Sequence, residues 1–345
     1  MTKLSLSVLV LISGFSSLAS AELQHLDDDA LGSVNGEGIG LVLENFSFEA
    51  GSDVASGNRL DITGINNADG EPVELSISQL YIAGDGSNQG QNVTGNTVNL
   101  GRLLYPWNIE LVDGDDIGIA DKAVFEFAAP ERFTGSSSEK PESLLGYNME
   151  NRTESRYPGQ QVASGTRVDS ISGVDTSVLS GRATELADLG VRFDLMENGV
   201  LAQSLEAHAT GVSVDGSYIR LWGSDNEMVG NINLNFYAAS LSMFACDADG
   251  NNCGQSVNIQ NYVLESAIGY GEEQPVTFEV DGDGNFTVEV GSIAGKTTAF
   301  YQDFYNNGPR TDIYIQNLSV GGKDFGSATV ANLQIQYLRA TSHDL

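Results

Sequence analysis

Alternation of apolar and polar residues is the sequence feature that most limits what this chain can fold into. It is clearest in residues 230–238, GNINLNFYA, where Ile232, Leu234 and Phe236 are separated by single asparagines. Successive side chains of a β-strand point to opposite faces, so a period of two predicts a strand with one apolar and one wet face. The chain is therefore expected to be all-β, with long antiparallel strands in a sandwich, a curled sheet or a barrel.

The same alternation recurs after residue 38 and sets the expected strands. The 40 glycines and only 7 prolines suit strands joined by Asn-Gly and Asp-Gly turns, such as VDGDGNF at residues 280–286. The predicted strands are residues 39–48, 74–83, 98–105, 124–128, 190–196, 204–214, 218–222, 231–245, 256–264, 276–280, 286–290, 312–320 and 328–338.

Two distant segments resemble each other. ELSISQLYIAGDG at residues 74–86 aligns with DIYIQNLSVGGKD at residues 312–324. In both, the apolar alternation shifts by one residue, at Gln79–Leu80 and at Asn317–Leu318. Such a shift predicts a β-bulge or a bend, and the two strands are expected to play equivalent roles.

The first residues of the chain read as a secretory signal. Lys3 precedes an apolar run at residues 4–12, and Ala19-Ser20-Ala21 forms a small-residue cleavage site. Residues 1–21 are therefore predicted to be a signal peptide that exports the chain. Residues 22–37 have apolar residues at helical spacing before a glycine cluster, which predicts a short helical leader segment.

The rest of the chain divides by composition. Residues 38–129 are expected to form an N-terminal β region and residues 168–345 a C-terminal β region. Between them, residues 130–167 hold three of the seven prolines and break the alternation, which indicates an irregular excursion or linker. Whether the two β regions form one continuous domain or two stays open at this level.

The charge balance excludes some partners. Aspartate and glutamate number 47 against 16 lysines and arginines, for a net charge of −31. Such a chain repels nucleic acids and anionic lipid headgroups. No segment outside the signal is apolar enough for a spanning helix, so no integral membrane helix is expected in the mature chain.

The two cysteines suggest a structural bridge. Cys246 and Cys253 flank the turn-rich sequence DADGNN, after the strand predicted at residues 231–245. In an exported protein the expected product is a local disulfide that closes a hairpin. A redox-active pair is usually closer in sequence, as C-x-x-C.

Catalytic and metal-binding motifs are not evident. The three histidines, His25, His208 and His343, form no metal-ligand spacing, and no nucleophile elbow or nucleotide-binding loop occurs. An enzyme is therefore not expected, nor is a cofactor. Two acidic turns begin like calcium loops but lack the glycine and glutamate of that motif. The weak Ca²⁺ candidates are Asp113, Asp115, Asp116, Asp281 and Asp283.

Several stretches resemble a known family. LQHLDDDALGSVNGEGIGLVLENFSFE follows the signal directly, and the chain also contains NFYAASLSMFACDADGNNC and FYNNGPRTDIYIQNLSVG. These stretches resemble the Fil-type pilus-system proteins of Gram-negative bacteria. The resemblance implies an exported structural or accessory component of a surface appendage, in the periplasm, at the cell surface or outside the cell. It supplies no catalytic residues.

Three functions are compatible with these patterns. The first is a pilus-system component that assembles with surface proteins or with itself through β-strand edges. Its candidate assembly strand contains Ile39, Leu41, Leu43, Phe46 and Phe48. The second is a periplasmic or extracellular carrier of an apolar ligand, which requires large apolar residues on strands without opposing partners. The third is an outer-membrane β-barrel.

Overall fold

The computed structural model describes most of the chain after residue 37. The described residues are 38–50, 59–87, 90, 92–132, 144–145, 174–180, 186–225, 227–247, 255–280, 282 and 284–342. The predicted signal peptide, the leader segment and most of residues 130–167 lie outside this set. Strands dominate the described residues, which confirms the all-β prediction.

The strands are β1 (Ile39–Leu41), β2 (Leu43–Phe46), β3 (Phe48–Ala50), β4 (Leu60–Asn66), β5 (Pro72–Gly84), β6 (Val98–Leu100), β7 (Trp107–Asp113), β8 (Ala123–Ala128), β9 (Ala187–Glu197), β10 (Val200–Val212), β11 (Tyr218–Ser224), β12 (Glu227–Asp247), β13 (Gln255–Ile268), β14 (Val276–Val280), β15 (Phe286–Val290), β16 (Thr311–Val320), β17 (Lys323–Leu333) and β18 (Leu338–Thr341). The helical elements are the 3₁₀ turns η2 (Gly114–Ile117) and η4 (Thr176–Val178) and the helix α2 (Thr298–Asn307). Among the described residues, no helix combines the length and apolar character that crossing a bilayer requires.

Sixteen of these strands form one antiparallel sheet around β12. This strand of 21 residues pairs with β11 and β10 along one side, and with β14 and β13 along the other. From β11 the sheet continues through β8 and β7 to β1, and from β10 it continues through β9 and β5 to β3. Strands from residues 38–129 and from the C-terminal region therefore share one sheet.

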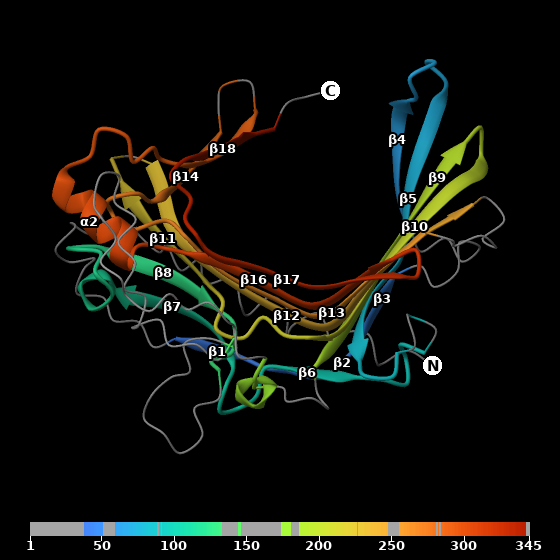
Figure 1. Cartoon of the computed structure of the whole chain (residues 1–345), viewed down its shortest axis with the longest axis horizontal. Helices are drawn as coiled ribbons and strands as arrows, with labels where there is room; N and C mark the ends of the chain where they lie inside the picture. The colour runs from blue at the N-terminus through green and yellow to red at the C-terminus, as the bar shows by residue number, and fades with distance from the viewer. Residues whose placement is uncertain are drawn as a thin grey trace, which may run out of the picture.

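The sheet bends into a trough. Figure 1 shows β12, β13, β16 and β17 curving along their length, with β4, β5 and β9 rising at one end and β14 and β18 at the other. At the bend, Gln79, Gly211 and Asn261 adopt positive φ values of 49°, 62° and 46°. Register shifts occur between Ser78 and Tyr81 in β5 and between Ile315 and Leu318 in β16, so both predicted bulges are confirmed.

The buried core lies under the convex side of this bend. The turn η4 lies on that side, below the floor of the trough in Figure 1. Around it, Leu144, Leu145, Leu179 and Leu186 pack against Tyr237 and Val263, with Tyr314 at the edge of the cluster. The side chains of Tyr237, Val263 and Tyr314 therefore point to the convex face, and their neighbours along each strand point to the concave face.

Some predicted boundaries were wrong. The single strand expected at residues 39–48 is three short strands, because Asn45 turns to a φ of 52° between irregular residues 42 and 47. The strand expected at residues 98–105 ends at Leu100, where a tight turn with an Arg102–Tyr105 bridge begins. The strand expected at 328–338 spans the break between β17 and β18, next to Asn332 with a φ of 59°. Strands β4 and β7 and helix α2 were not predicted.

Candidate functional site

The concave face of the trough is the candidate site, and rows of directly opposed residues define its lining. Directly opposed residues on neighbouring antiparallel strands point to the same face. One row crosses eight strands from β3 to β17. It consists of Phe48, Ile82, Leu189, Ala209, Leu241, Ile259, Leu318 and Gly326. Every member is apolar or glycine.

A second row crosses the other half of the sheet, from β1 to β13. It consists of Ile39, Ile109, Phe127, Ile219, Ile232 and Ile268. A third row, Phe236, Leu264, Ile313 and Val330, lies nearer the bend. Phe236 precedes the convex-facing Tyr237, and it packs with Leu189, Ala209 and Leu241 in one cluster. All three rows therefore belong to the concave face.

The concave lining is open to solvent. Leu205, Leu234, Met243 and Ile219 expose 44%, 40%, 42% and 39% of their surface. On the opposite face of β12, by contrast, Asn235 is 8% exposed. This differs from the expectation for β12, whose asparagine face was predicted to be the wet one. A continuous apolar surface of this kind marks a binding site rather than a scatter of surface side chains.

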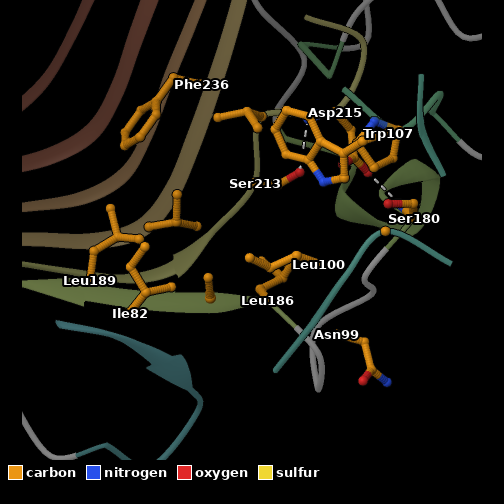
Figure 2. A pocket seen from close by; sticks show the side chains of 15 residues that line it. Ile82, Asn99, Leu100, Trp107, Ser180, Leu186, Leu189, Ser213, Asp215 and Phe236 are labelled. Atoms are coloured by element: carbon orange, nitrogen blue, oxygen red, sulfur yellow. Dashed lines mark hydrogen bonds between the residues drawn. The ribbon is translucent and has the colours of Figure 1, made fainter. Parts of the chain in front are cut away.

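A pocket lies where β10 ends and β11 begins along the same side of β12, and it is lined both by concave residues and by segments from below the floor of the trough. The cavity has a volume of about 240 Å³. Phe236, Leu189 and Ile82 lie on one side of it, and Leu100 and Leu186 on the other (Figure 2). Trp107 also lines it and stacks on Phe127, with 5.5 Å between the ring centres. The lining is mainly apolar, and residues from both halves of the sheet meet there.

Asp215 is the one charged residue among the described residues that line this pocket. Its Oδ2 accepts a hydrogen bond from the backbone N–H of Ser180, and its own N–H donates to Ser213 Oγ at 3.2 Å (Figure 2). Burial raises the pKa of Asp215, and the bond from Ser180 offsets this only in part. Holding the ionised carboxylate at this pocket therefore lowers the stability of the folded protein.

We expect Asp215→Asn to remove this destabilisation while its amide oxygen still accepts the Ser180 N–H. A raised pKa means that the folded state holds the proton more tightly, so stability falls as pH rises above the unfolded value of about 4. The variant should lose less stability than the wild type between pH 4 and 7, which thermal melts across that range would measure. An identical pH dependence in the two proteins would contradict this assignment.

His208 lies on the convex face, in a buried polar network. Its Nδ1 is 3.1 Å from the Tyr81 hydroxyl and its Nε2 is 3.4 Å from Glu206 Oε2. Arg192 bridges Glu206, at 3.1 Å, and Asp194, at 2.7 Å. The hydrogen bond from His208 lowers the pKa of Glu206, and burial raises the pKa of Tyr81 to about 12. These hydrogen bonds and ion pairs tie β5, β9 and β10 together. His208 is 3% exposed, so its imidazole is not an accessible reaction centre.

The acidic candidates have structural roles where they are described. Asp113 caps η2 by accepting from the N–H of Asp115 at 3.0 Å, and Asp115 accepts from the N–H of Asp121 at 3.0 Å. Asp116 lies in the first turn of η2. Within the described part of the chain, no group of three or more metal-ligating residues converges. Asp281 and Asp283 lie outside that part.

The disulfide and the assembly strand stay predictions. Cys246 is the penultimate residue of β12 and is 3% exposed, but Cys253 lies outside the described residues. Ile39 and Leu41 pair with β7, Leu43 and Phe46 with β6, and Phe48 with β5. The candidate assembly segment is thus paired within its own chain, and Ile39 and Phe48 begin two of the rows of the trough.

Sequence reasoning missed the trough, although its signal was present. Each strand showed apolar alternation, but no single strand reveals which of its faces another layer will cover. No protein-family model, no curated protein and no solved structure matches this chain. The shape and chemistry of the trough are therefore the basis on which a function is inferred.

Proposed function

We propose that the trough binds long apolar molecules, such as the acyl chains of lipids. The observation that supports this most directly is the row of apolar residues and glycine that runs from Phe48 to Gly326 across eight strands. Its members lie on a concave surface that is open along its length. This is the carrier function that the sequence left as an alternative.

An elongated chain fits this surface better than a flat partner does. A flat surface would touch the rims of the trough and leave its floor wet, whereas a chain can lie along the floor. Burial of apolar surface contributes about 25 cal/mol per Å², or about 0.8 kcal/mol per methylene. The pocket between Phe236 and Trp107 gives the end of such a chain a place to bind.

The charge of the protein and the uncharged lining of the trough indicate which lipid headgroups are favoured. The three rows that define the lining contain no ionisable residue, so they offer nothing to a charged headgroup. The chain as a whole carries −31. Because like charges repel, a lipid with an uncharged or zwitterionic headgroup is favoured over an anionic one.

The two tryptophans provide a direct test. Trp107 lines the pocket, whereas Trp222 is buried in a cluster on the convex face, 4% exposed. We expect a brominated monoacylglycerol, which carries no charge, to quench the fluorescence of Trp107 in a Trp222→Phe variant. It should leave Trp222 unaffected in the matched Trp107→Phe variant. Native mass spectrometry of protein purified without detergent should also show bound lipid.

The results that would overturn the proposal are equally clear. Equal quenching of the two tryptophans would indicate collision in solution rather than binding in the trough. Absence of quenching at saturating monoacylglycerol, together with a lipid-free mass spectrum, would exclude the carrier function.

A structural component of a pilus system is the second candidate function. It is favoured by the edges of the sheet, where β1, β4, β17 and β18 each pair on one side only among the described strands. Such edges are templates for pairing with another chain. Sedimentation with and without candidate surface partners tests it, and strictly monomeric behaviour in both cases would count against assembly.

A further inference from the structure

Strand β17 is the most exposed long edge in the described sheet. Among the described strands it pairs with β16 alone, and ten of its eleven residues are exposed. Its charged residues, Lys323 and Asp324, stand at its start, and residues 325–333 carry no charge. The N–H groups of Gly326 and Asn332 donate to aspartates of the same chain, and the outward N–H and C=O groups between these two residues lie along an uncharged edge.

The other edges are shorter or carry charge. Strand β1 has three residues and β18 has four, including Arg339. Strand β4 contains Asp61, which bonds Arg59 at 2.7 Å. Natural sheets guard their edges with charges, prolines or very short strands. β-Bulges also protect edges, and β17 has register shifts beside Gly326 and beside Asn332. Between them, residues 327–331 have none of these guards and are open to pairing with another chain.

The trough ends abruptly at this edge. Val330 faces Ile313 and Ala328 faces Ile315, so β17 carries the last apolar positions of the concave lining. Val330 is 44% exposed and Leu333 is 51% exposed. A partner that continues the sheet beyond β17 would also continue the lining and cover these side chains.

We propose that two copies of this chain pair through β17, antiparallel about a two-fold axis near Thr329, so that their troughs join end to end. A two-fold axis perpendicular to the sheet keeps both concave faces on the same side, so apolar lining meets apolar lining. Residues 325–333 form a neutral strip on a chain of charge −31, which lets two like-charged copies approach there. Dimerisation does not require a bound apolar ligand, and it lengthens the trough in which that ligand would lie.

The closed two-fold arrangement makes a specific prediction for Thr329. This residue faces Tyr314 and therefore points to the convex side, outside the trough. In the dimer it lies opposite its own copy, at the short distance of a cross-strand pair. We expect Thr329→Asp to place two like charges opposite each other and to weaken dimerisation by about tenfold or more.

Sedimentation velocity over a range of concentrations measures this. The wild type and the control Gln302→Asp, on the exposed face of α2, should dimerise alike, and Thr329→Asp should be shifted to monomer. Oxidised Thr329→Cys should give a covalent dimer. A monomeric wild type, a dimer that Thr329→Asp leaves unchanged, or open-ended polymers would each overturn the proposal. Quenching of Trp107 in Thr329→Asp would show that ligand binding survives, so the two proposals can fail separately.

Discussion

Leu234→Glu is expected to abolish binding of an apolar chain to the trough while the protein stays folded. Leu234 lies between Ile232 and Phe236 on the concave face of β12 and is 40% exposed, so the free protein can hydrate the new carboxylate. A bound chain removes that water, and the carboxyl must then take a proton. At pH 7 this costs about 4 kcal/mol for a pKa near 4.3, which weakens binding by about two orders of magnitude or more.

Titration of a fluorescent monoacylglycerol, read by energy transfer from Trp107 in the Trp222→Phe background, measures this loss. Leu103→Glu is the matched control, because Leu103 is 85% exposed in a turn outside the three rows. That variant should bind as the wild type does. Binding by Leu234→Glu should recover as the pH approaches about 4, where the carboxyl is neutral. Wild-type affinity of Leu234→Glu at pH 7 would show that the chain does not occupy the concave face.

The sequence predicted the strands well because their signal is local. Alternation located β5, β12 and the hairpin of β14 and β15, since the period of two is a property of each strand by itself. The bends at Gln79 and Asn317 were also predicted, because a bulge shifts the alternation within a few residues. Strand β7 was missed although Trp107, Ile109 and Leu111 alternate in the expected way.

The faces of the strands were not predictable in the same way. In β12 the asparagines were expected to form the wet face of the strand. In the structure Asn233 donates to the carbonyl of Gly216 at 2.8 Å, and Asn235 is buried. Which face is covered depends on segments far away in the chain, such as residues 174–180. The trough is a product of those contacts and of the bends at Gly211 and Asn261, which the sequence did not reveal.

Helix α2 was missed because its composition points to a strand. Its sequence TAFYQDFYNN has four aromatic residues, which are enriched in strands. The helical signal is the spacing of four between Phe300 and Phe304 and between Tyr301 and Tyr305, whose rings stack in both pairs. Thr297 caps the helix by accepting from the N–H of Phe300 at 3.1 Å.

This aromatic cluster makes Phe304→Ala the substitution with the largest expected loss of stability. Phe304 is fully buried, with ring centres 5.7 Å from Phe300, 5.9 Å from Tyr270 and 5.5 Å from Tyr305. Removing its ring leaves a cavity enclosed by rigid aromatic side chains, which cannot collapse to fill it. We expect the free energy of unfolding to fall by about 3–5 kcal/mol.

Urea unfolding of Phe304→Ala beside Gln302→Ala measures that loss. Gln302 lies on the exposed face of the same helix, so its substitution keeps the helix propensity high and should change stability by less than about 0.5 kcal/mol. A lower midpoint with an unchanged slope would mean that α2 unfolds together with the sheet. A small effect of Phe304→Ala, equal to that of the control, would show that α2 is not anchored on Tyr270 as the structure has it. The end of the sheet beside β14 would then lack the support that holds its strands in place.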